Sequence, residues 1–311
     1  MKNILVTGGL GFIGSNFIKH IFNKYDYKIF NVDVCTYASN FDNIDNNIAN
    51  SNRYSLIVSD INDTNDIKSL VQANNINYIV NFAAESHVDN SINDSTPFIS
   101  TNINGTHSLL TLLHDCPSIE KYLQVSTDEV YGSLTEEEDA FTENTPLQTN
   151  SPYSASKASA DLLCRSFYET FDYPILITRC SNNYGPNQHE EKLIPLMIKN
   201  AKAGKKLPVY GDGRNIRDWI HVSDHCSGID AVLHGGKIGE VYNIGGENEV
   251  RNIDIVKTIL KLLDKDEDQI EFVKDRLGHD WRYAIDNNKI QNELNWSPSI
   301  DFETGLKELL N

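Results

Sequence analysis

Short apolar runs alternate with longer amphipathic stretches along the first 180 residues. The apolar runs predict buried strands at Asn3–Thr7, Lys28–Asp33, Tyr54–Ser59, Tyr78–Ala83, Tyr122–Ser126 and Ile175–Arg179. The stretches between them space their apolar residues as helices do, at Phe12–Phe22, Asp66–Asn74, Asn102–His114 and Ser154–Phe171. Strands that are apolar on both faces and alternate with helices indicate a parallel sheet covered on both sides. The expected fold class is therefore α/β, a doubly wound (Rossmann) sheet.

The pattern is looser in the second half of the chain. It predicts a helix at Leu193–Ala203, a strand at Val241–Gly246 and a helix at Ile253–Leu263. We expect a main domain over residues 1–180 and a smaller lobe over residues 181–311, with some elements of the lobe returning to the main sheet. The asparagine-rich stretch Asn40–Asn52 predicts a surface loop without a function of its own.

Composition and charge narrow the class of protein. The 311 residues carry a net charge of −17, which argues against binding to nucleic acid or to an anionic membrane. Five cysteines without a CxxC pair favour reduced thiols and a cytoplasmic location. No run of 18 apolar residues is present to span a membrane. His87, His221 and His225 match no zinc spacing, so we expect no metal and assign these side chains to packing.

A glycine-rich segment, TGGLGFIG at Thr7–Gly14, follows the first strand and opens the first helix. In that context Gly8 permits a tight turn, Gly11 lets the backbone approach a pyrophosphate, and Gly14 lets the helix pack closely on the strand. The alternative is a glycine-rich turn that holds no ligand. The spacing predicts a dinucleotide site at the start of this helix.

The ends of the next two strands bear on the choice of cofactor. Asp33 ends the second strand, where a carboxylate accepts hydrogen bonds from ribose hydroxyls and repels a 2′-phosphate. Val34, Cys35 and Thr36 supply no arginine, so we expect NAD rather than NADP. Asp60 ends the third strand and either faces the adenine or caps the following helix; its position favours neither.

Tyr153 and Lys157 stand at positions i and i+4 of a predicted helix and share one face. A nearby ammonium favours the phenolate, so the spacing predicts a tyrosine that takes a proton from a hydroxyl. A chance YxxxK on a surface helix is the alternative. Together with the glycine-rich segment, this pair resembles the extended short-chain dehydrogenase/reductase family over essentially the whole chain.

Two carboxylates, Asp128 and Glu129, follow Thr127 at the end of the fifth predicted strand. Strand ends of a parallel sheet face the ligand crevice, and two adjacent carboxyl groups repel each other, so one holds its proton more readily than the other. One acid beside one base suits an elimination. The alternative is a solvated acidic turn.

Six segments resemble one branch of that family, the nucleoside-diphosphate-glucose 4,6-dehydratases. They are NFAAESHVD at Asn81–Asp89, VSTDEVYG at Val125–Gly132, TRCSNNYGP at Thr178–Pro186, EKLIP at Glu191–Pro195, RDWIHV at Arg217–Val222 and RLGHD at Arg276–Asp280. Relatives that only epimerise or decarboxylate generally lack the Asp-Glu pair. Trp281, between Asp280 and Arg282, departs from the usual pattern and leaves recognition of the base open.

The resemblance implies a role for each matching residue. Tyr153 would take the C4 hydroxyl proton with Thr127 holding that hydroxyl, Glu129 would act at C5, and Asp128 would protonate the departing C6 hydroxyl. Beside the three glycines, Tyr153 and Lys157, the implied NAD site comprises Phe12, Ile13, Asp33, Val34, Cys35, Thr36, Asp60, Ile61, Phe82, Ala83, Ala84, Glu85, Ser86, Thr101 and Asn183. The implied sugar-nucleotide site comprises Ser86, Thr127, Asn182, Lys192, Leu193, Pro208, Val209, Tyr210, Arg217, Asn252, Arg276, His279 and Tyr283.

The resemblance also implies a substrate and a partner. It favours dTDP-glucose and a homodimer formed through the helices near Asn102–His114 and Ser154–Phe171. A UDP-glucose 4,6-dehydratase and a UDP-sugar 4-epimerase are the enzymatic alternatives. A protein that senses NAD without catalysis is the third, although such a protein has no need of the tyrosine, the lysine and the acidic pair.

Overall fold

The computed structural model describes residues 1–275 and 277–310, and its centre is one parallel sheet. The strand order is β10-β6-β5-β4-β1-β2-β3, and every pairing is parallel. The strands are β1 (Asn3–Thr7), β2 (Lys28–Asp33), β3 (Tyr54–Val58), β4 (Tyr78–Asn81), β5 (Lys121–Thr127), β6 (Ile175–Cys180) and β10 (Val241–Ile244). The predicted doubly wound fold is confirmed. Its order reverses between β1 and β4, which opens a ligand crevice at the carboxyl ends of these strands.

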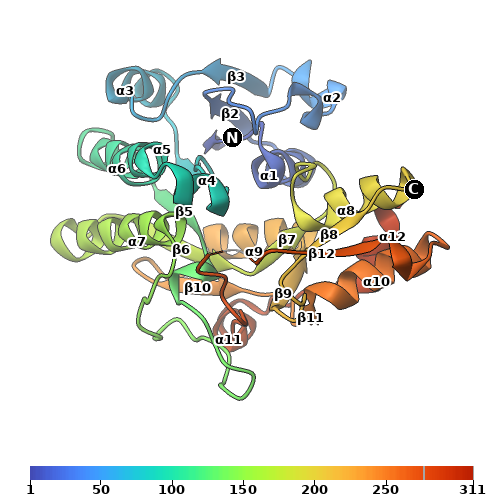
Figure 1. The fold of residues 1–311 in the computed structure, drawn as a ribbon. Coiled ribbons are helices and arrows are strands. Elements are labelled where there is room, and N and C mark those ends of the chain that lie inside the picture. Colours follow the sequence, from blue (N-terminus) through green and yellow to red (C-terminus); the bar gives the residue numbers. More distant parts are fainter. Residues whose placement is uncertain (276, 311) are drawn as a thin grey trace.

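Helices cover both faces of this sheet (Figure 1). On one face α1 (Phe12–Lys24) packs beside α9 (Val222–Gly235), and their apolar sides share a core with β1, β4 and β5. On the other face lie α3 (Thr64–Ala73), α6 (Thr106–Asp115) and α7 (Pro152–Phe171). Both faces of the strands are therefore buried, as their continuous apolar runs require.

The connection from β4 to α6 is more broken than its apolar pattern predicts. It contains α4 (Val88–Asn93), α5 (Thr96–Phe98) and a π-helical segment, Ile99–Gly105, ahead of α6. A β-carbon at Gly105 would lie 2.4 Å from a methyl carbon of Ile61, so a larger residue there would displace the Ile61 side chain. The predicted helix Asn102–His114 thus begins with a π turn, a distortion that often marks functional sites.

The second half builds a lobe beside the sheet. A small sheet has the order β11-β9-β7, and β8 pairs in parallel with β12. The bounds are β7 (Asn182–Tyr184), β8 (Leu207–Tyr210), β9 (Ile216–His221), β11 (Glu249–Arg251), β12 (Ile270–Val273), α8 (Leu193–Lys202), α10 (Asn252–Leu262), α11 (Asn288–Leu294) and α12 (Phe302–Glu308). Helices α8, α10 and α12 pack around Trp219 and Tyr184 in a separate core. Strand β10 and helix α9 return to the main sheet; the boundary at residue 180 stays a prediction.

The stretch Asn40–Asn52 is not the plain surface loop that its composition suggests. It holds a 3-10 helix, Phe41–Asn43, and the short helix α2 (Asn46–Ala49), and it buries Ile44 and Ile48 in the core beneath α1. The prediction of a surface loop was wrong, because it rested on the many asparagines and gave no weight to these two isoleucines. Two further 3-10 turns lie at Asp128–Val130 and Glu267–Gln269.

Within residues 1–275 and 277–310, no helix has the length and apolarity needed to cross a bilayer. The five cysteines are free thiols, and four of them are buried.

Candidate active site

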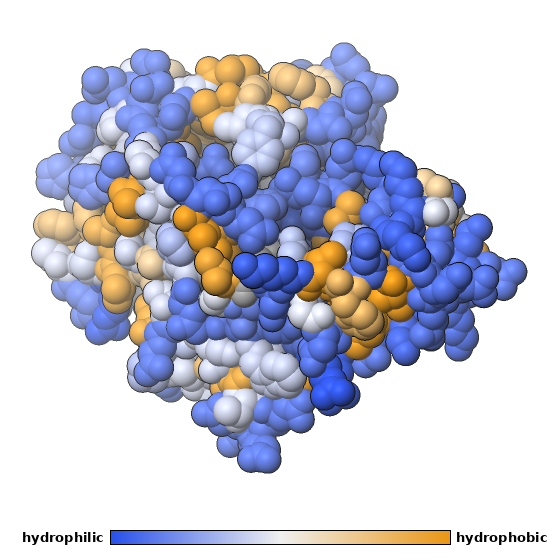
Figure 2. Space-filling model, viewed as in Figure 1, coloured by the Kyte–Doolittle hydropathy of each residue, from blue (hydrophilic) through white to orange (hydrophobic). Residues whose placement is uncertain are grey.

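A single large cavity of about 1160 Å³ opens at the carboxyl ends of the main strands and extends to the lobe. The space-filling view shows a hydrophilic hollow between these two parts of the molecule (Figure 2). Of the residues that the sequence assigned to NAD or to the sugar nucleotide, all that the structure describes line this cavity except Cys35 and Tyr283. Arg276 lies outside the described residues. The volume of the cavity exceeds that of a typical pocket for one small ligand, so the cavity has room for two ligands.

The glycine-rich segment forms the cradle at one end of the cavity. Gly8 has a φ of +67°, and a β-carbon there would lie 2.8 Å from the backbone nitrogen of Ala83. A β-carbon on Gly14 would lie 2.4 Å from the carbonyl oxygen of Gly8, which explains the close packing of α1 on β1. Gly11 is the N-cap of α1 and offers no side chain to the N–H groups of the first turn. These donors therefore remain available to an anionic oxygen, so the loop fits a pyrophosphate.

Asp33 braces this cradle from the end of β2. One carboxylate oxygen accepts from the backbone N–H of Leu10 at 2.9 Å, and the other accepts from Cys35 N–H at 2.8 Å and Ser39 Oγ at 2.7 Å. The carboxylate is buried but still lines the cavity. It therefore presents a negative charge where a 2′-phosphate would lie, in agreement with the prediction of NAD over NADP.

The assignment of Cys35 to the cavity lining was wrong. Its backbone has a φ of +59°, its N–H holds Asp33, and its side chain packs against the core beside α1. Asp60 also holds its own turn, since Oδ1 accepts from Asn62 N–H at 2.9 Å. It lines the cavity without capping α3, whose N-cap is Asp63.

Tyr153 and Lys157 stand in the first turns of α7 beneath the cavity. Ser151 caps this helix by accepting from Ser154 N–H at 3.0 Å, and Pro152 starts it. Both predicted side chains are buried. Lys157 Nζ donates to the carbonyl oxygen of Val125 at 2.7 Å, which anchors the helix to β5.

The pKa of Tyr153 does not move in the predicted direction. Burial raises it well above its ordinary value, the charge of Glu129 adds to the rise, and a hydrogen bond with Thr127 opposes it. Burial also lowers the pKa of Lys157. Burial therefore outweighs any influence of the lysine on the pKa of the tyrosine.

The acidic pair follows Thr127 at the end of β5, as the sequence predicts. Asp128 is only 2% exposed; Oδ1 accepts from Thr127 Oγ1 at 3.3 Å, and Oδ2 has no hydrogen-bond partner. Burial raises the pKa of Asp128 well above its ordinary value, and the charges of Glu129 and Asp218 add to this. Burial and the neighbouring charges therefore favour the protonated form of Asp128.

Arg217 reaches the cavity from β9. Its guanidinium donates to the carbonyl oxygens of Ile216 at 2.7 Å and Asp280 at 2.9 Å and stacks on the ring of Tyr283 at 4.3 Å. Tyr283 is buried behind this arginine, and its hydroxyl donates to the Asp280 carboxylate. The prediction that Tyr283 lines the site was wrong: it supports Arg217 from behind.

The comparisons with known proteins agree with this geometry. Residues 5–309 match the profile of the family described as GDP-mannose 4,6 dehydratase. The chain belongs to this family. It is 50% identical to the low-salt glycan biosynthesis protein Agl12 of Haloferax volcanii, over 98% of this chain and 96% of that protein. It is 46% identical to dTDP-glucose 4,6-dehydratase of Haemophilus influenzae, over 99% and 96%.

Solved structures are also similar to this chain. The dTDP-glucose 4,6-dehydratase of Bacillus anthracis, crystallised in complex with NAD, superposes with a TM-score of 0.93 at 51% identity. The match covers 100% of this chain and 96% of that one.

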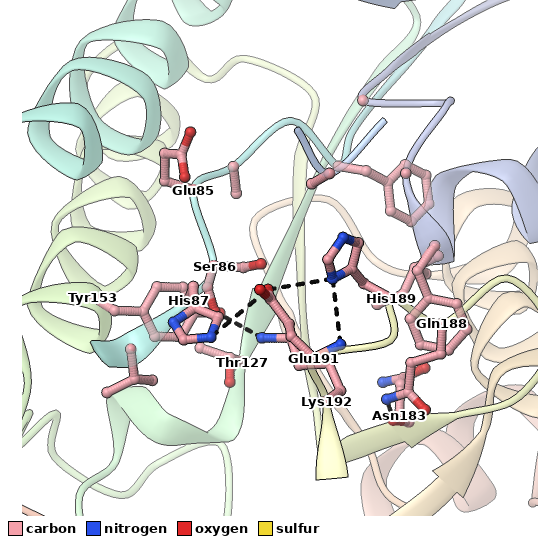
Figure 3. A pocket seen from close by; sticks show the side chains of 18 of the residues that line it. Glu85, Ser86, His87, Thr127, Tyr153, Asn183, Gln188, His189, Glu191 and Lys192 are labelled. Carbon is pink, nitrogen blue, oxygen red and sulfur yellow. Dashed lines mark hydrogen bonds and ion pairs between the residues drawn. The ribbon is translucent and has the colours of Figure 1, made fainter. Parts of the chain in front are cut away.

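Several residues that line the cavity were not assigned to the site from the sequence. Tyr37 and Ser39 follow β2, His87 follows β4, and His189 and Glu191 lie between β7 and α8. Figure 3 shows three of them, with Glu191 between His87 and His189. His87 and Glu191 lie in matching segments but were not assigned to the site, and the other three residues stand in loops without periodicity. Of the three histidines assigned to packing, His87 lines the cavity, whereas His221 and His225 are buried.

Proposed function

We propose that this chain catalyses the NAD-dependent 4,6-dehydration of a nucleoside-diphosphate glucose, with dTDP-glucose as the substrate. The product is a 4-keto-6-deoxy sugar nucleotide and one water. One observation carries the proposal: a buried carboxyl group with one unpaired oxygen, Asp128, stands beside Glu129 and Tyr153 in the cavity that also holds the glycine cradle. An enzyme that oxidised C4 without eliminating water would have no use for this acid.

The cradle supports NAD as the cofactor. When bound, NAD supplies an acceptor for the C4 hydrogen, a donor for C6 and a positive charge beside the tyrosine. The first turn of α1 would hold its pyrophosphate, and Asp33 its adenosine ribose. Asn102 supports the opposite wall, because its side-chain amide donates to the carbonyl oxygen of Glu85 and accepts from the N–H of Glu85, both at 2.9 Å.

The chain's own residues move the protons. Tyr153 takes the proton of the C4 hydroxyl while Thr127 holds that hydroxyl, and C4 becomes a ketone. The ketone acidifies the C5 hydrogen, which Glu129 removes as a proton. Asp128 gives its proton to the C6 hydroxyl, the C6–O bond breaks, and water leaves. After C6 is reduced, Glu129 returns the proton to C5.

The protonation states balance over the cycle. Tyr153 ends with one proton more and Asp128 with one fewer, and Thr127 hydrogen-bonds to both side chains. The proton taken at C4 can therefore return to the acid used at C6 without leaving the site. The cofactor is restored in the same cycle, so it has no reason to dissociate between turnovers.

The substrate's diphosphate needs cations in a protein with a net charge of −17. Arg217 lines the cavity with a guanidinium already oriented by Tyr283, and Lys192 lines it from the start of α8. We assign both to the phosphate oxygens, because a rigid guanidinium fork and a mobile ammonium suit this anion.

We further propose a cytoplasmic homodimer. Free, mostly buried thiols suit a reducing compartment. Leu162 and Phe171 on α7 are each more than half exposed, and the adjacent Ile99 is 49% exposed. Hydrophobic side chains also show beside α7 in Figure 2. An interface on this face would cover them, and sedimentation at two concentrations tests for the dimer.

The decisive experiment supplies dTDP-glucose and UDP-glucose together and follows both by mass spectrometry. We expect loss of one water from the thymidine nucleotide first. If the two sugar nucleotides lost water at nearly equal rates, the experiment would establish the dehydration but would not identify the preferred base. One methyl group, the difference between the two bases, contributes only about 1 kcal/mol in an apolar pocket. Galactose nucleotides without loss of water would overturn the proposal. In heavy water, Glu129→Gln should nearly abolish deuterium entry at C5; undiminished exchange would contradict the role of Glu129.

A further inference from the structure

A loop of the lobe crosses the cavity and is tied down at the cradle. We call residues 186–192, between β7 and α8, the strap. At its start, Asn16 Nδ2 donates to the carbonyl oxygen of Pro186 at 2.9 Å, and Asn187 Nδ2 donates to Ser15 Oγ at 3.1 Å. Asn187 also donates to the carbonyl oxygen of Asn43 at 3.3 Å. The strap is thereby attached to the first turns of α1, where the pyrophosphate would lie.

The other end of the strap reaches the segment that follows β4 (Figure 3). Glu191 Oε1 lies 3.7 Å from His87 Nε2 and 3.6 Å from His189 Nδ1, so one carboxylate links a histidine of each side. Lys192 Nζ donates to the carbonyl oxygen of Ser86 at 3.4 Å. These contacts join the lobe to the main domain across the cavity.

Tyr37 adds a second crossing from the end of β2. The side chains of Glu85 and Asn90, beyond the end of β4, lie close enough to its hydroxyl to shift the pKa of Tyr37 in opposite directions. Its ring meets the ring of His189 edge-on, with centroids 6.2 Å apart. Segments after β2, β4 and β7 therefore meet in one set of contacts over the cavity, although they lie up to about 150 residues apart in the chain.

We propose that Tyr37 and the strap form a clasp over the dinucleotide, so that NAD leaves only after these contacts open. Tyr37, His87, His189 and Glu191 are then positioning residues that retain the cofactor. The inference rests on the proposed function, because a reaction that restores its own cofactor gains from keeping it bound. Each contact is partly exposed and weak alone. Because these contacts join the same segments, their individual effects on NAD release add together.

The test measures how fast NAD leaves the holoenzyme. The protein is loaded with radiolabelled NAD, chased with excess unlabelled NAD in the absence of any sugar nucleotide, and sampled by rapid filtration. We expect Tyr37→Phe and Glu191→Gln each to raise the dissociation rate by about three- to tenfold, the effect of one partly exposed hydrogen bond or ion pair. The double variant should exceed either single one. Asn187→Ala, at the opposite end of the strap, should also raise it.

Glu190→Gln is the matched control. Glu190 is in the strap, but its carboxylate pairs with Lys199 of the same lobe, at 2.5 Å, and makes no crossing. Its rate should stay within twofold of the wild type. An unchanged rate in the double variant, or an equal rise in Glu190→Gln, would overturn the clasp. Circular dichroism of each variant checks the fold. Because no sugar is present, the two proposals can fail separately. Slow NAD release that the variants accelerate, in a protein without dehydratase activity, would uphold the clasp and refute the proposed function. Dehydratase activity with an NAD release rate that the variants leave unchanged would refute the clasp and uphold the function.

Discussion

Two aspartates of this protein are equally buried and behave in opposite ways. Asp128, at the end of β5, is 2% exposed, and Asp230, on α9 behind the sheet, is 1% exposed. Asp128 has one long hydrogen bond, from Thr127, and an unpaired Oδ2. Asp230 accepts from Lys24 Nζ at 2.6 Å, with further hydrogen bonds from His20, Tyr25 and His234.

Their pKa values separate accordingly. Burial raises the pKa of Asp128, and the neighbouring charges of Glu129 and Asp218 reinforce that rise. Burial also acts to raise the pKa of Asp230, but hydrogen bonds from His20, His234 and Lys24 outweigh it and lower the value well below the ordinary range. Burial alone thus does not decide whether a carboxyl group is ionised. Its partners make one a structural anchor between α1 and α9 and leave the other available for chemistry.

The largest expected effect is on turnover. Asp128→Asn removes the proposed acid while keeping the shape of the side chain, so kcat for dehydration of dTDP-glucose should fall about 10²- to 10⁴-fold. Asp230→Asn is the matched control and should keep kcat within a few fold. Equal losses in the two variants would mean that both act through the fold, and the contrast between them would fail.

The next effect is on stability. Asp230→Ala leaves Lys24, His20 and His234 without their shared acceptor, and the free energy of unfolding should fall by about 2–4 kcal/mol. Urea denaturation of the holoprotein measures it. Asp26→Ala removes an exposed carboxylate that lies 3.8 Å from Arg53 and should change stability by less than about 0.5 kcal/mol. A loss at Asp230 no larger than this control would remove its role as an anchor.

The stability that Asp230 provides should depend on pH in a defined direction. Its folded-state pKa lies below the unfolded value of about 3.9, so its contribution is complete above pH about 4 and is lost as the pH falls further. The difference in unfolding free energy between wild type and Asp230→Asn should therefore be constant from pH 7 to about 5 and shrink below 4. A difference that grew with acidification would contradict this sign.

The smallest expected effect is that of Asp128 on the stability of the folded state. Because the pKa of Asp128 is raised, the folded state loses stability as the pH rises above the unfolded value of about 3.9, and the loss is complete once the pH exceeds the folded value. Asp128→Asn should therefore raise the unfolding free energy by about 1 kcal/mol at pH 8, and the gain should vanish below pH about 4. Denaturation at the two pH values tests this. If Asp128→Asn lowered the unfolding free energy at pH 8, the buried carboxyl group of Asp128 would not be destabilising the folded state.

Much of this architecture was predictable from local pattern. The bounds of β1 and β2 agree with the apolar runs, since strands buried on both faces leave an unbroken signal. The glycine cradle and the Thr127–Glu129 triplet were found because each function is carried by consecutive or regularly spaced residues. The fold then brings them into one cavity.

The failures have a common physical cause. Cys35 and Tyr283 stand beside residues that line the cavity but do not line it themselves, and sequence position does not reveal side-chain direction in a loop. The raised pKa of Tyr153 reflects burial, which the i, i+4 spacing to Lys157 cannot register. Tyr37 and Glu191 meet their partners across the cavity, through contacts between distant loops that leave no periodic trace.

The place of β10 at the edge of the main sheet has a consequence for synthesis. Strand β6 ends at Cys180, and its outer neighbour begins at Val241. At about 5–20 residues per second, a ribosome needs several seconds to deliver that neighbour. During this interval the nascent chain presents the open edge of β6, a template for pairing with other chains. The hazard lasts until residues 241–244 have emerged, well after the cradle and the carboxylates of Asp128 and Glu129 have been made.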